Sequence, residues 1–239
     1  MNPQNQDFEG RNDVQSGQSH SRRSFPFMTY CCVIDNYCVC YCLFMKQVIL
    51  VTGTPCVGKT TLAIQLAKCL DAFYVNLTDY AKQNGLILGE DSERDTVIVA
   101  EQKMRQVLPV TISQSVCSVV VVDGHFAASV VPDGLATYVF VLRRNPVELK
   151  EFMQKEGFSE AKLFENLSAE ILDVCLVEAL QAQTGKICEV DVTGKSVDQS
   201  VDELLSILLG KCECVCGGVV DWLGFLEREG LTDQYLKLC

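Results

Sequence analysis

The segment from Gly53 to Thr60 contains the residues whose types and spacing most clearly predict chemistry. It reads Gly-Thr-Pro-Cys-Val-Gly-Lys-Thr and matches the phosphate-binding pattern G-x-x-x-x-G-K-[ST] at every fixed position. A loop of this kind turns backbone N–H groups toward an anion, and the helix that follows adds a favourable dipole. We therefore expect Lys59 to reach the terminal phosphates of a nucleotide and the hydroxyl of Thr60 to bind Mg²⁺.

The sequence on both sides of this loop predicts the strand and the helix that it requires. Residues 47–52 form an apolar, β-branched run that is typical of a buried parallel strand. Residues 61–68 place apolar side chains at helical spacing. Because pattern and context agree, we interpret the segment as a nucleotide-binding loop rather than as a chance glycine turn.

Two later strands are predicted to end in charged residues that could act on the same phosphates. The apolar residues 117–122 lead to Asp123, and a carboxylate at that place in such a sheet holds Mg²⁺ through water. The alternative role of Asp123 is to cap a turn or helix. Residues 136–142 lead to Arg143 and Arg144, whose forked guanidiniums suit phosphate oxygens. The alternative for this pair is a surface position beside acidic neighbours.

The alternation of strands and helices predicts an α/β fold, a P-loop NTPase with a parallel sheet covered by helices on both faces. Thr78 is the expected N-cap of a helix that Gly85 ends, and Pro146 should open a later helix. The other predicted segments are a strand over 73–75, a charged loop over 89–97, a helix over about 98–109 closed by Pro109, a break at 157–159, a long helix over about 160–183, a strand over 187–191 and a helix over about 197–209.

The composition limits the classes of partner and compartment. The 239 residues are 48% hydrophobic and carry a formal charge of −11. This acidity argues against direct nucleic-acid binding and suits a basic protein partner. The 14 cysteines come without a secretory signal pattern. We therefore expect a reducing compartment, the cytoplasm or the nucleus of a eukaryote, with free thiols or metal ligands rather than disulfides.

Residues 1–44 are predicted to be an extension outside the fold. Residues 1–27 are polar and are expected to be disordered. Residues 28–45 are apolar, but Asp35 and Asn36 at their centre argue against a membrane span. The five cysteines of this stretch could bind a metal, although their spacing matches no zinc pattern. The extension could also be a start-site artefact.

Several separate sequence blocks occur in one order along the chain. They are Val51-Thr52-Gly53-Thr54-Pro55, Gly58-Lys59-Thr60-Thr61, Leu77-Thr78-x-x-Ala81-Lys82, Asp91-x-Glu93-Arg94-Asp95-Thr96, Asp123-Gly124-His125, Val141-Leu142-Arg143-x-Asn145-Pro146, Glu165-Asn166-x-x-Ala169-Glu170-Ile171, Thr193-Gly194-Lys195-Ser196 and Val220-Asp221-Trp222-Leu223. With these blocks, residues 45–225 resemble the small adenylate-kinase-like NTPases of archaea and eukaryotes that also take part in maturation of the small ribosomal subunit.

The resemblance implies a nucleoside-monophosphate-kinase core over residues 45–209, with a monophosphate-binding insertion at about 76–108 and a short lid at about 153–165. It implies transfer of the terminal phosphate of ATP to AMP or a similar monophosphate, with Mg²⁺ as cofactor and slow ATPase activity. The implied partner is a basic small-subunit ribosomal protein. Two alternatives remain, an ATPase-type assembly factor with weak or lost kinase activity and a nucleotide-binding module without turnover.

The resemblance also assigns roles to single residues. It places Asp123 and His125 at Mg²⁺ and ATP hydrolysis, and the loop of Thr193 and Lys195 against the adenine. Catalysis would combine Lys59, Asp123, His125 and Arg143. The expected nucleotide contacts are Gly53, Pro55, Cys56, Val57, Gly58, Lys59, Thr60, Thr61, Arg94, Thr193 and Lys195, and the expected Mg²⁺ site is Thr60 with Asp123.

Elementary chemistry agrees with a kinase, because the phosphate of AMP is already anionic and needs no strong general base. Arg94 is expected to bind that phosphate; its alternative is a loop charge paired with Glu93 or Asp95. If water is the phosphate acceptor, His125 could position that water molecule. The alternative role of His125 is to form a structural hydrogen bond.

Two positions depart from the family pattern. Glu156 stands where a lid arginine would contact the transferring phosphates, and this predicts weak transfer to AMP. Cys56 replaces the usual glycine. Near Lys59 and a helix N-terminus its thiol could have a lowered pKa, and the alternative is a small inert side chain.

The C-terminal residues 210–239 are predicted to form a separate tail. Cys212, Cys214 and Cys216 would lie on one face of an extended segment, but a metal site needs a fourth ligand and none is close in the sequence. Residues 219–226 are amphipathic, contain the only tryptophan and are expected to dock on the core.

Overall fold

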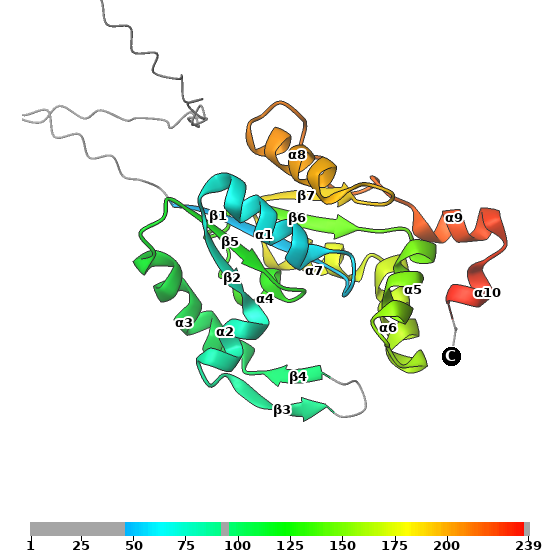
Figure 1. Ribbon diagram of the computed structural model, residues 1–239, viewed down its shortest axis with the longest axis horizontal. Helices are drawn as coiled ribbons and strands as arrows, with labels where there is room; N and C mark the ends of the chain where they lie inside the picture. The colour runs from blue at the N-terminus through cyan, green and yellow to red at the C-terminus, as the bar shows by residue number, and fades with distance from the viewer. Residues whose placement is uncertain (1–45, 92–95, 237–239) are drawn as a thin grey trace, which may run out of the picture. The chain divides into compact units, whose positions relative to one another are not determined.

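A sheet of five parallel strands forms the centre of the structure, in the order β2-β5-β1-β6-β7 (Figure 1). The computed structural model describes residues 46–91 and 96–236, so the expectations for residues 1–45 and for Arg94 lie outside the described residues. The strands of the sheet are β1 (Gln47–Gly53), β2 (Phe73–Asn76), β5 (Val119–Asp123), β6 (Tyr138–Arg143) and β7 (Lys186–Asp191).

Strand β1 is the middle strand and is buried on both of its faces. Ile49 and Val51 point into one hydrophobic cluster, and Val48 and Leu50 point into the other. All four side chains are fully buried, which explains why the strand reads as a continuous apolar run.

Helices cover both faces of the sheet, as expected for an α/β fold (Figure 1). The helices that contribute to the cluster on one face are α1 (Lys59–Leu70), α5 (Pro146–Lys155), α6 (Glu160–Ile171), α8 (Val197–Leu208), α9 (Trp222–Glu229) and α10 (Thr232–Tyr235). Those that contribute to the cluster on the other face are α2 (Leu77–Gln83), α3 (Glu101–Gln114), α4 (Ala127–Val130) and α7 (Val174–Ala182). The predicted fold class is confirmed.

The register of the sheet brings the functional strand ends together. Val51 of β1 lies opposite Asp123 of β5, and Gly53 lies opposite Leu142 of β6. Since all of these strands are parallel, their carboxyl ends meet at one edge, where ligands bind in open α/β sheets.

Helix α3 continues beyond Pro109 to Gln114, so the prediction that this proline ends the helix is wrong. Met104, Leu108 and Ile112 lie four residues apart and are all buried, so their burial continues along one face past the proline. The ammonium group of Lys46 also donates to the carbonyl oxygens of Ile112, Ser113 and Ser115 at the end of the helix, at 2.7, 3.1 and 2.5 Å.

Two other predicted boundaries differ from the structure. Asn76, not Thr78, caps α2, because its side chain accepts a hydrogen bond from the backbone N–H of Asp79. The long helix predicted over 160–183 is broken into α6 and α7 at Asp173, which adopts a left-handed conformation with φ of 58°. Its carboxylate binds Arg143, so a long-range contact accompanies the break.

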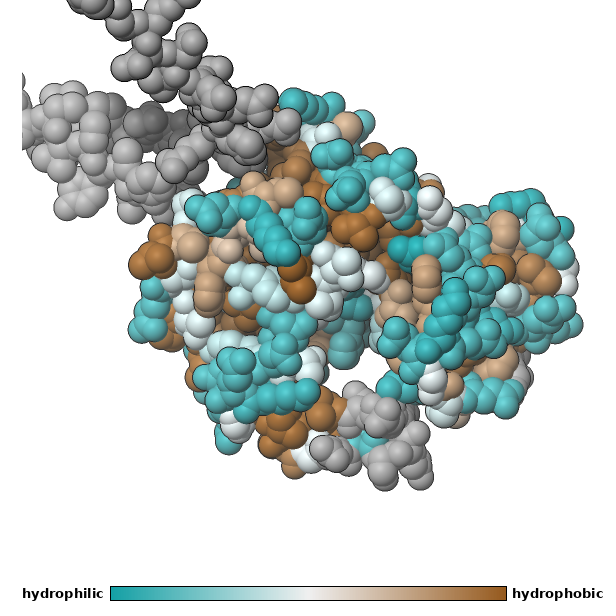
Figure 2. All heavy atoms as spheres, in the orientation of Figure 1, coloured by the Kyte–Doolittle hydropathy of each residue, from teal (hydrophilic) through white to brown (hydrophobic). Residues whose placement is uncertain are grey.

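The sequence predicts a charged loop over 89–97, but in the structure both ends of this stretch belong to strands of an antiparallel hairpin. Strand β3 (Ile87–Asp91) pairs with β4 (Thr96–Val99), whose β-branched residues favour a strand. Leu88 and Ile98 are exposed, and Figure 2 shows apolar residues gathered over this hairpin.

The C-terminal segment, which we define as residues 210–236, packs against the core as expected. Trp222 and Leu226 are buried in the same cluster as α1 and α8. Cys214 forms a disulfide with Cys188 of β7, so the expectation of free thiols or metal ligands rather than disulfides is wrong for this pair, whereas Cys212 and Cys216 are free. None of the helices in the described part of the chain is long and apolar enough to span a bilayer.

Candidate active site

The phosphate loop, Gly53–Thr60, connects β1 to α1 at the carboxyl edge of the sheet. Its close approach to β6 requires glycine at position 53, where φ is 136° and a Cβ atom would lie 2.5 Å from the carbonyl oxygen of Leu142. Gly58 also has a positive φ, 103°, immediately before α1. Cys56 adopts a φ of 68°, a conformation that residues other than glycine rarely take.

Lys59 lies at the start of α1 with its side chain folded over the phosphate loop. Its ammonium group donates to the carbonyl oxygen of Thr54 at 2.8 Å. Burial lowers the pKa of Lys59, while the nearby carboxylates of Asp123 and Glu170 act in the opposite direction. An anion at this place would favour the charged form of the lysine.

Thr60 and Asp123 come together as a candidate Mg²⁺ site. The Thr60 hydroxyl donates to Oδ2 of Asp123 at 2.7 Å, and the same oxygen accepts from Tyr74 and Asn76 at 3.0 and 2.9 Å. Asp123 is 1% exposed, and within residues 46–91 and 96–236 no group donates to its Oδ1. Burial, together with the charge of Asp123, raises the pKa of Tyr74.

A buried carboxylate oxygen without a donor beside a threonine hydroxyl fits Mg²⁺ and the water molecules that it keeps. Across the described residues, no cluster of three or more His, Cys, Asp or Glu side chains could hold a metal ion. The site therefore fits an ion that is held largely by substrate phosphates and water, as Mg²⁺ usually is beside nucleotides.

Arg143 does not face the phosphate loop as its proposed catalytic role requires. Its guanidinium is surrounded by the carboxylates of Glu170, Asp173 and Glu189, at 3.0, 2.5 and 2.5 Å. The residue is 1% exposed; burial acts to lower its pKa, but the carboxylates of Glu170 and Asp173 outweigh burial and raise it. This geometry assigns Arg143 to the interior of the protein, where it links β6 to α6 and β7.

Arg144 is the arginine that reaches the pocket. Its guanidinium donates to the carbonyl oxygen of Val57 at 3.2 Å, forms an ion pair with Glu148 and lies 4.9 Å from the ring centre of Phe152. The sequence indicated an arginine pair at this strand end, but the assignment favoured Arg143. The acids that bind Arg143 lie 27, 30 and 46 residues away in the sequence, so no local pattern indicates them.

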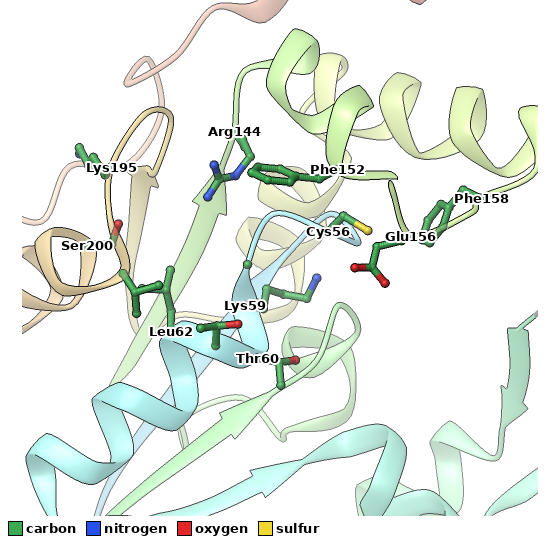
Figure 3. Close-up of a pocket in the computed structure, with 13 residues that line it drawn as sticks. Cys56, Lys59, Thr60, Leu62, Arg144, Phe152, Glu156, Phe158, Lys195 and Ser200 are labelled. Carbon is green, nitrogen blue, oxygen red and sulfur yellow. The ribbon is translucent and has the colours of Figure 1, made fainter. Parts of the chain in front are cut away.

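A pocket of about 590 Å³ lies over the phosphate loop (Figure 3). Lys195 and Ser200 line one side, and Phe152, Glu156 and Phe158 line the other. Of the expected nucleotide contacts, the residues that line it are Cys56, Gly58, Lys59, Thr60, Thr61 and Lys195. Gly53, Pro55 and Val57 belong to the phosphate loop behind this lining.

The two expected adenine contacts differ in their surroundings. Lys195 lines the pocket, and its ammonium group binds Glu203 at 2.7 Å. Thr193 is not among the lining residues; its hydroxyl accepts from the N–H of Asn145 and donates to Asp191, at 2.9 and 2.5 Å. Thr193 thus shapes the loop that carries Lys195.

His125 lies two residues after Asp123, and its carbonyl oxygen accepts from the Thr52 hydroxyl at 2.9 Å. More than a third of the residue surface is exposed, yet surrounding protein atoms and then the charge of Lys59 lower its pKa to about 4. The imidazole is therefore neutral at pH 7 and can accept a proton or a hydrogen bond from water.

Cys56 and Glu156 both line the pocket, and the structure places both beside Lys59 (Figure 3). Burial raises the pKa of Cys56, an effect that outweighs Lys59, so the expectation of a lowered pKa is wrong. The Glu156 carboxylate points into the side of the pocket where the Lys59 side chain ends, so the phosphate side contains an acid.

Comparison with known proteins agrees with this geometry. A family model described as an AAA domain matches residues 49–173. A Methanocaldococcus jannaschii protein named "Putative adenylate kinase" is 35% identical over 174 residues, 73% of this chain and 92% of its own length. Proteins of the same name from Thermococcus kodakarensis and Pyrococcus furiosus are 38% and 36% identical over 176 and 194 residues, 74% and 80% of this chain and 93% and 98% of their own lengths.

The matched region contains the phosphate loop, Asp123 and Arg144, and the chain covers nearly the whole length of these relatives. By the family model and by this extended similarity, the chain belongs to the adenylate-kinase-like P-loop family of these archaeal proteins.

Proposed function

We propose that this protein is a nucleoside monophosphate kinase that transfers the terminal phosphate of ATP to AMP or a similar monophosphate. The observation that carries the proposal is the convergence of Lys59, the Thr60–Asp123 pair and Arg144 at one pocket. The family relationship to proteins named as adenylate kinases supports the choice of substrate class.

The residues of this chain divide the work between binding and charge neutralisation. The backbone of the phosphate loop binds the phosphates of ATP, and the ammonium group of Lys59 leaves the carbonyl oxygen of Thr54 to contact them. Arg144, which lines the pocket and donates to the phosphate loop at Val57, stabilises negative charge on the phosphates. Mg²⁺, when bound, supplies neutralisation of the phosphate charge beside Thr60 and Asp123.

The monophosphate would lie on the side of the β3–β4 hairpin and α2, in the insertion at about residues 76–108. Because a phosphate acceptor is already ionised, this side needs a cation and correct placement rather than a base. We assign the cation to Arg94. We assign the lid to residues of about 153–165, which comprise the end of α5, a turn at Gly157 and the start of α6; Glu156 and Phe158 of this stretch line the pocket and support the assignment.

A coupled assay with ATP, AMP and Mg²⁺ tests this function directly. We expect ADP to form in a manner that requires both nucleotides, and Lys59→Ala to reduce the rate by a factor on the order of 10³, because it removes the main cation of the pocket. If no ADP forms above background in the unchanged protein, the kinase assignment is rejected.

Glu156 limits the proposed rate, since a carboxylate stands on the phosphate side of the pocket. Glu156→Arg should raise the rate of transfer to AMP, by a factor that reaches on the order of 10³ if the new guanidinium clamps the phosphates. Glu156→Gln is the matched control, because it removes the charge without adding a cation and should give a smaller gain. An equal gain from both variants would mean that only the negative charge matters.

A second candidate is an ATPase that assists assembly of the small ribosomal subunit, with little kinase activity. Two observations favour it: Glu156 in the pocket and the neutral His125, which could orient water for hydrolysis. The net charge of −11 suits a basic ribosomal protein as partner. Phosphate release from ATP without AMP, together with ATP-dependent pull-down of a small-subunit ribosomal protein, would establish this function. Absence of both would exclude it.

A further inference from the structure

We propose that Trp222, in the C-terminal segment, positions the phosphate loop for ATP by holding Glu170 in place. Trp222 lies 163 residues after Lys59 in the sequence and does not line the pocket. It is therefore a positioning residue, and the proposal rests on the proposed binding of ATP at the phosphate loop.

Glu170 is the group through which Trp222 acts. Its carboxylate is 1% exposed, and its Oε2 accepts from the Thr54 hydroxyl at 2.6 Å. Its Oε1 accepts from the indole N–H of Trp222 at 3.0 Å, from the side chain of Arg143 at 3.0 Å and from the backbone N–H of Arg144 at 3.1 Å. One buried carboxylate therefore joins the C-terminal segment, β6 and the phosphate loop.

In the ligand-free protein, the path from the tryptophan to the lysine consists of three hydrogen bonds. Trp222 donates to Glu170, Thr54 donates to the same carboxylate, and Lys59 donates to the carbonyl oxygen of Thr54. Thr54 is fully buried within the loop, so its backbone follows the carboxylate that holds it. A displacement of Glu170 would consequently reach the residues that bind phosphate.

The C-terminal segment has other attachments that do not depend on the indole N–H. The N–H of Glu189 donates to the carbonyl oxygen of Val215, and the Glu189 carboxylate accepts from the N–H of Val219, at 2.8 and 3.1 Å. The disulfide at Cys214 and the fully buried Leu226 add two further anchors. Removing only the indole N–H should thus leave the segment docked while it releases one donor from Glu170.

A buried carboxylate that loses one of its donors turns toward the donors that remain. Three donors hold Oε1 and one holds Oε2, so Trp222→Phe changes how the carboxylate is oriented toward Thr54. We expect ATP–Mg²⁺ to bind about tenfold more weakly, which is less than the full effect of losing a hydrogen bond to a buried charge. AMP should bind as before.

The path is tested by measuring ATP–Mg²⁺ affinity, by equilibrium dialysis, for the proteins of a double-mutant cycle. Thr54→Val keeps the shape of the loop residue but removes the hydroxyl that Glu170 holds. We expect Trp222→Phe to weaken binding about tenfold in the unchanged protein and less than about twofold in the Thr54→Val protein, because the path is already cut. Equal factors in both backgrounds, or no effect in either, would overturn the proposal.

Leu226→Val is the matched control for general loosening of the segment. Leu226 is fully buried on the same helix as Trp222 and is part of the same hydrophobic cluster. Measured well below the unfolding temperature, this variant should keep the ATP affinity within about twofold, since it removes packing but no donor to Glu170. A loss as large as that of Trp222→Phe would refute a role for the indole N–H.

Trp222 is the only tryptophan, so its fluorescence provides a test that needs no mutation. ATP–Mg²⁺ should change the tryptophan emission along the binding curve measured by dialysis, and AMP alone should not. Binding of ATP without a change in emission would overturn the inference. The same samples separate this result from the proposed function: a linked emission change without ADP formation rejects the kinase and keeps the inference, and ADP formation with unchanged emission does the reverse.

Discussion

Replacement of Asp123 by asparagine should separate stability from Mg²⁺ dependence. In the ligand-free protein Oδ2 accepts three hydrogen bonds, from Thr60, Tyr74 and Asn76. A neutral acceptor weakens each bond by about 1 kcal/mol, so about 3 kcal/mol is lost in total. Against this loss, the variant no longer buries a charge at a residue that is 1% exposed, which relieves a cost of several kcal/mol.

These two effects nearly cancel, so the free energy of unfolding of Asp123→Asn should stay within about 2 kcal/mol of the unchanged protein. The effect on catalysis has no such compensation. Loss of a carboxylate that holds the water around a metal ion typically weakens metal binding by about 10–100-fold. We expect the Mg²⁺ concentration at half-maximal ADP formation to rise by that factor.

Two measurements examine these expectations, urea unfolding without nucleotide and ADP formation across a range of Mg²⁺ concentrations. Asp133→Asn is the control, because Oδ1 of Asp133 also accepts three hydrogen bonds, from Gly134 and Thr184, and the residue does not line the pocket. The Mg²⁺ dependence of Asp133→Asn should be unchanged. If Asp123→Asn forms ADP with a half-saturating Mg²⁺ concentration within about twofold of normal, the assignment of Asp123 to Mg²⁺ is refuted.

Three further predictions concern the loop, the disulfide and the histidine. Cys56→Gly should raise the free energy of unfolding by about 1 kcal/mol in urea, because φ is 68° at this position, and a decrease would show that the thiol packing matters more. Cys214→Ser should lower that free energy by roughly 3 kcal/mol, because the disulfide closes a separation of 26 residues. A reductant should then have no further effect through this disulfide. An unchanged free energy of unfolding would contradict stabilisation by the disulfide. The pKa of His125 is lowered to about 4 in the folded protein, so as the pH falls the unfolded chain takes up this proton before the folded protein does. The stability due to neutral His125 is therefore present above about pH 6.5 and is lost as the pH falls toward 4. His125→Gln should flatten this part of the pH dependence of unfolding, whereas identical slopes for both proteins would disprove the shift.

The local sequence pattern was sufficient to predict those parts of the fold that depend on residues close together in the chain. Strand β1, the phosphate loop and α1 follow from one continuous stretch of residues. The apolar run before Asp123 likewise predicted a buried strand, and the structure brings its carboxylate to Thr60.

Contacts between residues far apart in the sequence determine the features that local sequence patterns do not predict. Arg143 and Arg144 look equivalent at the end of one strand, and only the acids at positions 170, 173 and 189 decide that Arg143 turns inward. The end of α3 depends in the same way on burial of Ile112 and on Lys46, which lies far away in the sequence.

The disulfide and the hairpin illustrate the same limit. Cys214 has two neighbouring cysteines at a spacing of two, yet its partner is Cys188 on β7. The charged residues at positions 90 and 91 predicted a loop, whereas pairing of β3 with β4 places them in a strand. The disulfide forms only after the chain has brought Cys188 and Cys214 together, and the hairpin only when the neighbouring strands β3 and β4 pair with each other.

The docking of Trp222 onto Glu170 has a consequence for the order in which the protein is made. The phosphate loop leaves the ribosome early, but the donor that completes its support is encoded 163 residues after Lys59. At about 5–20 residues per second, the loop waits roughly 8–33 s for that donor. During synthesis the nascent chain therefore carries a phosphate loop whose Glu170 lacks the hydrogen bond from Trp222, and full ATP binding begins only after Trp222 has been made and has docked.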